Sequence, residues 1–503
     1  GHINPPRFHL HHRSIRWLCT LGCGDPSGAG WAGPQGSQRQ RGWKLTDSSD
    51  ALRPEITETH TGLVVLVGDR AYKVKKPVTT DFLDFSTTAS RERACAHEVM
   101  LNSRLAPGSY LGVAHFQSPQ GGDPEPVIVM RRHPDERRLA TMVRRGRDVT
   151  GQLTAIAELL ARFHAGAGRG REVDDEARVD AVGARWRENL AELARYAGGV
   201  VPGVDPDCVE EIGRRALGFL AGRAVLFAGR ISDRRIVDGH ADLLADDIFC
   251  LPDGPALLDC LEFEDRLRYV DGIDDAAFLA MDLEFLGRPD LAAHFLGRYL
   301  AEARDDAPES LRHFYIAYRA VVRAKVDCVR HTQGGAGAAD SARAHLRVAR
   351  EHLREGTVRL ILVGGGPGTG KTTLARGIAD RVGAQVISTD DVRSAMVASG
   401  ELAGRPGVLG QGLYGRENIE AVYDAVLRRA HLGLCEGHTV ILDGTWSDPD
   451  YRERARRVAA EAAAIMVELA CAAPLDDTLS RIRTRTGTTS QVTPEIAAAL
   501  AGP

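Results

Sequence analysis

The sequence lacks long uninterrupted apolar runs, and its cysteines are not paired in motifs. The longest apolar stretches, such as residues 63–67, are far shorter than the roughly 20 residues of a membrane-crossing helix. No segment joins a basic start, an apolar middle and a small-residue cleavage site, as a secretory signal would. The nine cysteines contain no C-x-x-C pair, which favours free thiols in a reducing compartment. We therefore expect a cytoplasmic protein with no membrane partner.

A strong net charge is also missing. The chain has 64 Lys and Arg against 68 Asp and Glu, which gives a net charge of −4 with neutral histidine. No global basic field favours nucleic acid as a partner. The length of 503 residues suggests about two to four domains, and a hydrophobic content of 43% permits large cores. The composition does not indicate an oligomeric state.

Residues 1–45 differ from the rest of the chain in composition. They are rich in Gly, Pro, Gln and His and show no periodicity, so we expect a disordered tail. The segment offers metal ligands, but their spacing matches no known ligand framework. These ligands are His9, His11, His12, Cys19 and Cys23. The first residue is Gly1 rather than Met, which leaves processing, a tag or a misassigned start open.

A glycine-rich loop follows the apolar run 358–363, a predicted buried strand, and precedes a predicted helix. From Gly365 the spacing is G-x-x-x-x-G-K-T, the pattern of a phosphate-binding loop in this context. Glycines let backbone N–H groups surround phosphate oxygens, and the helix N-terminus adds positive charge. Lys371 would reach the β- and γ-phosphates of ATP, and the Thr372 hydroxyl would hold Mg²⁺. The predicted ATP-binding residues are Gly365, Gly366, Pro367, Gly368, Thr369, Gly370, Lys371, Thr372 and Thr373.

Two later predicted strands lead into acidic residues. The strand near residues 384–388 precedes Asp390, and the strand at 439–442 ends in Asp443. The carboxyl ends of parallel strands face the nucleotide crevice, so Asp443 is a predicted Walker B-like Mg²⁺ ligand. Arg481 and Arg485 follow a predicted helix and suit a lid that closes over phosphates; a solvated arginine face is the alternative.

The first half of the chain has the order of a protein-kinase-like small lobe. A strand lysine comes first, then a glutamate on a helix, then a strand that leads into a linker. Lys73 and Lys75 alternate on one strand and point to one face, and Glu98 lies on the helix. In kinases the lysine binds the α- and β-phosphates and the glutamate orients the lysine. The alternative is that the lysines lie on an edge strand and only protect it from aggregation. The predicted elements are strands at 61–67, 70–75 and 127–130 and a helix at 91–105.

Three aspartates further along have the spacing that kinase-like catalysis requires. These aspartates are preceded in sequence by predicted helices at residues 153–164, 177–195 and 208–228. Then Asp242 is placed as a base, Asp247 five residues later as a metal ligand, and Asp259 on the following hairpin as a second metal ligand. An acidic solvated turn is the alternative.

Residues from about 55 to 330 resemble the aminoglycoside phosphotransferase family. More narrowly, they resemble bacterial proteins in which such a domain is fused to a P-loop kinase. The resemblance implies that Asp242 takes a proton from a substrate hydroxyl and that Asp259 binds Mg²⁺. It makes Lys73 the phosphate-binding lysine, with Lys75 as its rival. The segments that carry the resemblance are residues 72–77, 98–102, 258–263 and 277–283.

The catalytic loop departs from the family pattern His-Gly-Asp-Leu-His-x-x-Asn. Ala241 stands for the glycine, Leu244 for the second histidine and Asp247 for the asparagine. An aspartate still binds Mg²⁺, but it does so as an anion, and the added charge should alter the balance between metal and ATP.

The last part of the chain resembles the small P-loop kinases of the gluconate kinase, polynucleotide kinase and zeta-toxin group. Their Asp-x-x-Arg motif after the second strand matches Asp390 and Arg393. By this resemblance Asp390 is the base or the anchor of the substrate hydroxyl, and Arg393 binds the acceptor. Arg481 and Arg485 fall where the lid arginines belong. Related domains run on beyond the equivalent of Pro503, so we expect an incomplete end.

We predict two kinase-type domains behind the tail. Residues 46–355 form an α+β bilobal protein-kinase-like domain, and residues 356–503 form an α/β P-loop domain with a parallel sheet. Both would use ATP and Mg²⁺ to phosphorylate a hydroxyl of a small molecule such as a sugar, an aminoglycoside or a related alcohol. Two alternatives stay open: a P-loop ATPase with a degenerate ligand-binding first domain, and an antibiotic-resistance enzyme. A nucleic-acid 5′-kinase is weaker, because no basic, aromatic-studded groove is visible.

Overall fold

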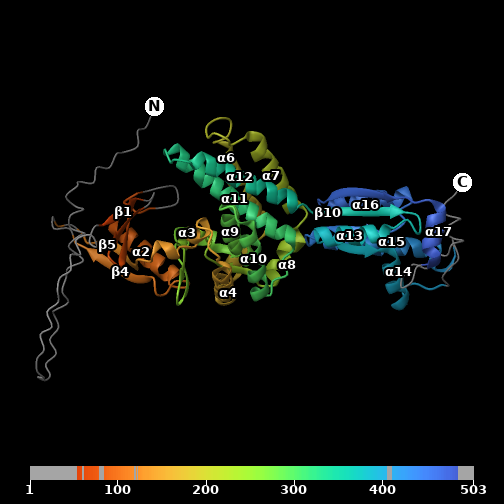
Figure 1. Ribbon diagram of the computed structural model, residues 1–503, viewed down its shortest axis with the longest axis horizontal. Helices are drawn as coiled ribbons and strands as arrows, with labels where there is room; N and C mark the ends of the chain where they lie inside the picture. Colours follow the sequence, from red (N-terminus) through yellow and green to blue (C-terminus); the bar gives the residue numbers. More distant parts are fainter. Residues whose placement is uncertain are drawn as a thin grey trace, which may run out of the picture. The chain divides into compact units, whose positions relative to one another are not determined.

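The computed structural model describes residues 54–58, 62–78, 84–117, 121, 123–404 and 411–484 (Figure 1). The predicted disordered tail at 1–45 therefore lies outside the described residues. By their contacts the residues form two units, the first up to residue 155 together with 242–265, and the second comprising 156–241 and the chain from 266 onward. The domain bounds at 46–355 and 356–503 stay a prediction.

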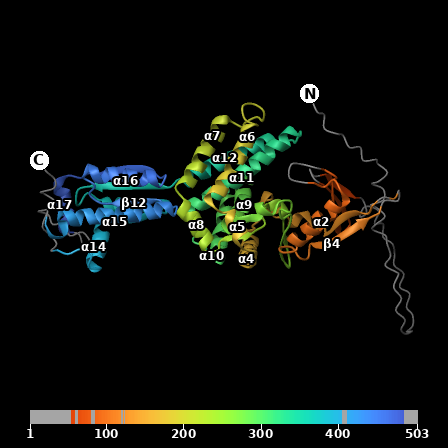
Figure 2. The same cartoon turned by 180° about the vertical axis from the view of Figure 1, so that it is seen from behind.

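The first unit is built on a five-stranded antiparallel sheet in the order β1-β2-β3-β5-β4. β2 and β3 form the predicted hairpin, with Gly68 at its turn in a left-handed conformation. Helix α2 packs on β4 and β5, and Figure 2 shows α2 beside β4. The elements are β1 (Glu55–Glu58), β2 (Gly62–Val67), β3 (Arg70–Lys75), α2 (Thr88–Asn102), β4 (Tyr110–Phe116), β5 (Glu125–Arg131), α3 (Leu139–Arg144), β7 (Ile248–Leu251) and β8 (Gly254–Leu257).

The core of this unit lies between the sheet, α2 and the β7–β8 hairpin. Cys95 of α2, Ile128 of β5 and Phe249 of β7 are buried together there. The β7–β8 hairpin follows the predicted catalytic loop in sequence. Because the hairpin is packed in this core, it also fixes the position of the acidic residues at the end of the loop. The sheet-and-helix arrangement confirms the predicted α+β class and the kinase-like order of its elements.

The second unit begins with helices that enclose an aromatic core. Trp186, Phe314 and Tyr318 meet there, and the Trp186 ring lies 5.4 Å from the Phe314 ring between centroids. The elements are α4 (Thr150–Gly166), α5 (Arg171–Asp175), α6 (Val179–Ala194), α7 (Pro206–Ala221), α8 (Ala224–Ser232), β6 (Ile236–Asp238), β9 (Tyr269–Asp271), α9 (Gly272–Phe285), α10 (Pro289–Ala303), α11 (Glu309–Thr332) and α12 (Ala338–Glu355).

The prediction of one helix over residues 208–228 was wrong. The structure has two helices, because α7 ends at the cap residue Gly222 and α8 begins only after Arg223. Arg223 has φ −122° and ψ 20°, outside the helical region. Glycine is the residue that most readily leaves a helix, and the apolar periodicity continues on both sides of it, which hides the break.

The later part of the second unit is a four-stranded parallel sheet in the order β11-β12-β10-β13. This confirms the predicted α/β class. The parallel register aligns the carboxyl ends of β10, β11 and β12, since Val363 and Ser388 both lie opposite Asp443. The elements are β10 (Arg359–Gly365), α13 (Lys371–Val382), β11 (Gln385–Ser388), α14 (Thr389–Ala398), α15 (Arg416–Cys435), β12 (Val440–Asp443), α16 (Pro449–Glu461), β13 (Ile465–Cys471) and α17 (Leu475–Thr484).

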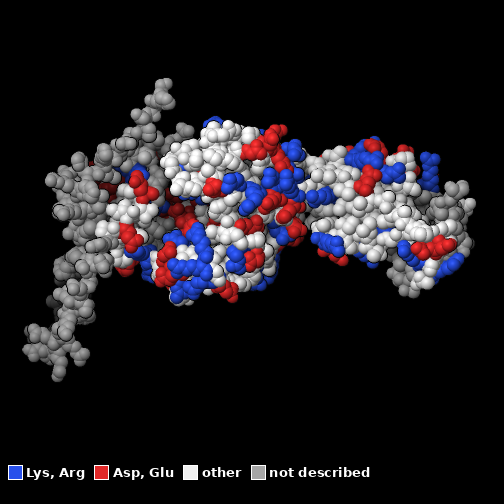
Figure 3. Space-filling model, turned by 45° about the horizontal axis from the view of Figure 1, so that its top comes forward, with Lys and Arg blue, Asp and Glu red and all other residues white. Residues whose placement is uncertain are grey.

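Acidic and basic side chains are interspersed on the face drawn in Figure 3, in keeping with the nearly balanced charge of the chain. Among the helices of the described ranges, none is both long and apolar enough to cross a membrane.

Replacing Trp186 tests the aromatic core. The Trp186 side chain is fully buried, so Trp186→Ala should lower the free energy of unfolding by about 3–5 kcal/mol through lost burial and a cavity. Val200→Ala is the control, because Val200 is 55% exposed and its loss should cost less than about 0.5 kcal/mol. Urea unfolding followed by circular dichroism measures both; a loss below about 1 kcal/mol for Trp186→Ala would contradict this packing.

Candidate phosphate-binding and acidic sites

The glycines of the predicted phosphate loop adopt conformations that other residues avoid. Gly365, Gly368 and Gly370 have φ of 143°, 77° and 95°. A Cβ at Gly365 would lie 2.3 Å from the carbonyl oxygen of Cys471, and one at Gly368 would lie 2.7 Å from that of Thr478. The loop between β10 and α13 therefore requires glycine at these positions. A loop of this kind leaves backbone N–H groups open toward an anion at the start of α13.

The Lys-Thr pair after the glycines lies at the N-terminus of α13. The Lys371 ammonium donates to the carbonyl oxygen of Gly366 at 2.8 Å, so it folds back over the loop. The Thr372 hydroxyl donates to the carboxylate of Asp443, at the end of β12, at 2.7 Å. A hydroxyl and a carboxylate at one point supply the hard oxygen ligands that Mg²⁺ prefers. The structure thus brings together two predicted metal ligands that are 71 residues apart in sequence.

Electrostatics at the strand ends favour a cation. Burial raises the pKa of Asp443, and Asp390 and Asp391 add to this effect, while the Thr372 hydroxyl and Lys371 oppose it. The buried carboxylate therefore carries an unfavourable charge that a bound cation would compensate.

Asp390 and Arg393 form an ion pair in the first turn of α14, with 2.6 Å between the guanidinium nitrogen and the carboxylate oxygen. Ser388 caps this helix by accepting from the backbone N–H of Asp390. The Arg393 guanidinium also lies over the Tyr414 ring, 4.8 Å from its centroid. The predicted acceptor-side pair is therefore held together beside the carboxyl end of β11.

Of the two predicted lid arginines, Arg481 lies on α17 and its guanidinium donates to the carbonyl oxygen of Gly368 at 3.3 Å. It thus touches the phosphate loop. Arg485 lies outside the described residues, so its place in a lid stays a prediction.

In the first unit a buried glutamate joins two strand lysines. Glu98 of α2 is fully buried, and its two carboxylate oxygens lie 2.8 Å from the Lys73 ammonium and 2.6 Å from the Lys75 ammonium. This confirms that both lysines point to one face of β3. Lys73 also contacts the Asp259 carboxylate at 2.7 Å, whereas Lys75 contacts that of Glu262 at 2.8 Å. Burial opposes the charge of Lys73, but Asp259 and Glu98 outweigh it and raise its pKa well above the usual value.

The two lysines differ in their surroundings. Lys75 is almost completely buried between Glu98 and Glu262, which suits a structural support. Lys73 is more open and links the helix glutamate to Asp259, the predicted metal ligand. The role of Lys73 as the lysine that meets phosphate, with Lys75 as the alternative, stays a prediction.

His240 and Ala241, which precede Asp242 in sequence, are held within the second unit by α9. The carboxylate of Asp275, in the first turn of α9, accepts from the backbone N–H groups of His240 and Ala241, both at 2.7 Å. The imidazole of His164 contacts the same carboxylate at 3.0 Å. Ala241 has φ 67°, a left-handed conformation that costs a non-glycine residue roughly 1–2 kcal/mol. A glycine at this position would adopt the conformation without that cost.

The three predicted catalytic-loop aspartates crowd one another. Burial raises the pKa of Asp247 well above its usual value, and the charges of Asp259, Asp242 and Asp246 raise it further, while Arg138 opposes them. Asp259 also has a left-handed backbone, with φ 61°. Strain and like charge at one point are typical of a site that binds a cation.

Sequence reasoning missed several positioning residues. Asn102, one turn after Glu98, accepts from the backbone N–H of Cys260 at 2.8 Å and so fixes the segment after Asp259. Arg319 of α11 pairs with Asp274 at 2.7 Å and donates to the carbonyl oxygen of Ala241 at 3.2 Å. Their partners lie far away in sequence, so no local spacing could reveal them.

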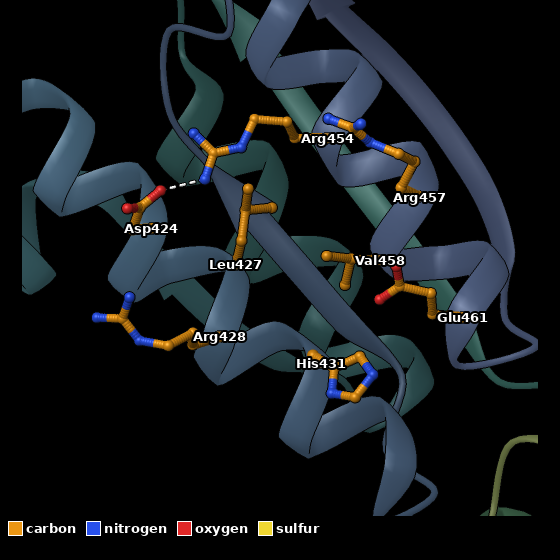
Figure 4. A pocket seen from close by; sticks show the side chains of 8 residues that line it. All are labelled: Asp424, Leu427, Arg428, His431, Arg454, Arg457, Val458 and Glu461. Carbon is orange, nitrogen blue, oxygen red and sulfur yellow. Dashed lines mark hydrogen bonds and ion pairs between the residues drawn. The ribbon is translucent and has the colours of Figure 1, made fainter.

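One cavity, of about 490 Å³, lies in the P-loop part of the chain. It is lined only by side chains of α15 and α16, and Figure 4 shows Asp424 paired with Arg454 across it. None of the predicted site residues lines it. One of its acids, Asp424, is held in an ion pair with Arg454, and we assign the cavity no part in phosphate binding.

Comparisons with known proteins agree with the predicted P-loop domain. A sequence family described as an AAA domain matches residues 360–500. Three uncharacterized proteins of Mycobacterium tuberculosis and Mycobacterium bovis are 60% identical over 447 residues, which cover 89% of this chain and 89% of each relative.

Among solved structures, a choline/ethanolamine kinase family protein from Mesorhizobium loti is 16% identical. It covers 68% of this chain and 98% of its own, with a TM-score of 0.38. The GDP complex of aminoglycoside 2′-phosphotransferase-IIIa is 13% identical, covers 59% of this chain and 91% of its own, and has a TM-score of 0.35.

Replacing Asp247 by asparagine tests the crowding of the aspartates. Since the folded state raises the pKa of Asp247, the ionised carboxylate costs stability once the pH exceeds its unfolded pKa of about 4. In metal-free buffer Asp247→Asn should therefore be more stable than the wild type at pH 7, on the order of 1 kcal/mol, and equally stable below about pH 4.

Differential scanning calorimetry at both pH values measures this difference. Asp253→Asn is the control, because Asp253 is exposed in the turn between β7 and β8 and is not among the charges that raise the pKa of Asp247, so its replacement should bring no gain. An Asp247→Asn protein that is less stable than the wild type at pH 7 would refute the like-charge repulsion.

Proposed function

The chain belongs to the same family as these mycobacterial proteins, and we propose that the family consists of ATP-dependent phosphotransferases with two kinase-type sites. Each site would transfer the γ-phosphoryl group of ATP to a hydroxyl of a small molecule. The contact between Thr372 and Asp443 carries the proposal, because it places two hard oxygen ligands at the end of a glycine loop suited to phosphate.

At the second site the roles follow from position. The loop from Gly365 to Gly370 would surround the phosphates with backbone N–H groups, and Lys371 would turn from the Gly366 carbonyl to the β- and γ-phosphates. Arg481, already on the loop, would add positive charge as the γ-phosphoryl group moves. Asp390 would accept the proton of the attacking hydroxyl, and Arg393 would hold the acceptor.

At the first site Lys73 would bind the α- and β-phosphates and Glu98 would orient it, as their contact suggests. Asp242 would take the proton of the acceptor hydroxyl. Mg²⁺, held by Asp247 and Asp259 here and by Thr372 and Asp443 at the second site, would neutralise charge on the phosphate oxygens. In both sites the protein acts by positioning and by charge compensation rather than by covalent chemistry.

The acceptor is a small alcohol rather than a macromolecule in this proposal. The Asp390–Arg393 pair offers one carboxylate and one guanidinium, which suit the hydroxyls of a polyhydroxylated ligand. A sugar, an aminoglycoside or a related alcohol has such groups.

A second candidate function has a specific observation in its favour. Asp247 replaces the asparagine of the family pattern, and its crowding with Asp242 and Asp259 weakens the case for ATP at the first site. In this alternative the P-loop domain hydrolyses ATP while the first unit is a ligand-binding module.

The decisive experiment incubates the full chain with Mg²⁺ and γ-labelled ATP against pooled sugars, aminoglycosides, nucleosides and small alcohols. Lys371→Ala should lower label transfer by the second site at least about 100-fold, because charge at the γ-phosphoryl group is lost. Asp242→Asn and Asp390→Asn should each lower transfer by their own site about 100-fold or more, because each removes a general base.

Two exposed residues supply matched controls. Arg381→Ala changes the last turn of α13, and Asp253→Asn changes the turn between β7 and β8; both should retain wild-type transfer. Label released only as free phosphate, and lost only in Lys371→Ala, would favour the ATPase. Label transfer that survives in Lys371→Ala, Asp242→Asn and Asp390→Asn would overturn the residue roles.

A further inference from the structure

The hairpin of α11 and α12 brings together two histidines that belong to neither proposed phosphate site. His313 lies near the start of α11 and His352 near the end of α12, with 2.8 Å between their Nδ1 atoms. Glu355 follows His352 by three residues, so both lie on one face of the helix. A Glu355 carboxylate oxygen is 3.8 Å from Nδ1 of His313. One ligand atom of each residue lies within 4.8 Å of the other two.

We propose that His313, His352 and Glu355 bind a divalent transition metal ion of the zinc type. Two imidazoles and one carboxylate are a ligand set that zinc uses, with a fourth position open to water. Bonds of about 2.0–2.1 Å in tetrahedral geometry place neighbouring ligand atoms about 3.3 Å apart. The observed distances of 2.8 and 3.8 Å lie on either side of this value, so small side-chain rotations would form the site.

A second carboxylate orients one of the two imidazoles. Nε2 of His352 lies 2.6 Å from a carboxylate oxygen of Glu284 on α9. The carboxylate only accepts, so Nε2 carries the proton and Nδ1 of the neutral ring directs its lone pair at the site. A carboxylate behind a histidine in this way is the usual support of a metal-binding imidazole.

The second imidazole is also suited to bind a cation. Burial lowers the pKa of His313 to about 4, helped by His352 and Arg312, so its ring is neutral at pH 7. Without an ion, the proton on Nδ1 of His313 makes the hydrogen bond to His352. A bound ion would displace that proton from Nδ1, and solvent would supply a proton to Nε2 of the same ring. A carboxylate oxygen of Glu309 lies 3.9 Å from this Nε2 atom.

The backbone holds His313 in place. A Cβ on Gly356, the residue after α12, would lie 2.6 Å from Cβ of His313, so only glycine allows this approach. An ion here would join the end of α12 to α11, and β10 begins only three residues after Gly356. A plain hydrogen bond between the histidines would give the same ion-free geometry, and binding measurements separate the two cases.

The test titrates Zn²⁺ into the full chain, stripped of metal with a chelator, and measures stoichiometry and affinity by calorimetry. Other histidines and cysteines also bind zinc, so the comparison is between variants. His352→Gln should lose one equivalent of bound Zn²⁺, Glu355→Gln should bind it at least tenfold more weakly, and Glu284→Gln roughly 10–100-fold more weakly. Glu351→Gln, an exposed glutamate of the same helix outside the site, should match the wild type.

Co²⁺ gives an independent readout, because a tetrahedral site with imidazole ligands has strong visible absorption. This absorption should appear in the wild type and in Glu351→Gln and be lost in the double variant His313→Gln/His352→Gln. A folded double variant that binds Zn²⁺ with wild-type stoichiometry and affinity would overturn the proposal. If that variant does not fold, the Glu355→Gln variant decides the question, because Glu355 is exposed. A Zn²⁺ affinity of Glu355→Gln equal to that of Glu351→Gln would also overturn the proposal.

Discussion

A buried carboxylate requires a cation nearby, and this constraint organises the first unit. Glu98 has no exposed surface, and two lysines of one strand neutralise it. Removing one partner of such a pair leaves an uncompensated buried charge, which costs about 3–5 kcal/mol. The pairing therefore ties α2 to β3 and at the same time directs Lys73 toward Asp259. The contact that stabilises the fold is also the contact that orders the proposed phosphate site.

The same constraint recurs among the helices of the second unit. Arg230 is buried between Asp271 and Asp305, and Arg319 is buried against Asp274. Asp275, the neighbour of Asp274, has its pKa lowered although its burial acts in the opposite direction, because His164 and backbone N–H groups compensate its charge. These pairs fix α9 and thereby the residues that lead into Asp242. Burying charge is expensive, so each group is held in one geometry, which a catalytic loop needs.

Local spacing predicted the parts of the sites that lie within one loop or strand. The glycine loop, the shared face of Lys73 and Lys75, and the acids at the strand ends follow from periodicity and turn chemistry. Thr372 and Asp443 were predicted separately as Mg²⁺ ligands, and the hydrogen bond between them is a finding of the structure. Contacts such as Arg319 with Asp274 depend on the packing of distant helices, and the break at Gly222 interrupts no apolar pattern. Local sequence patterns therefore could not predict these two features.

The two proposed sites share one electrostatic property that no single motif reveals. Burial and neighbouring carboxylates raise the pKa of Asp247 in one and of Asp443 in the other. Each site therefore lowers the stability of the ion-free protein. A bound cation compensates the charge of the carboxylates and so stabilises the folded state by linkage. In the proposed function this cation is the phosphate-bound Mg²⁺, and Lys73 and Lys371, which lie beside the two clusters, would bind the phosphates.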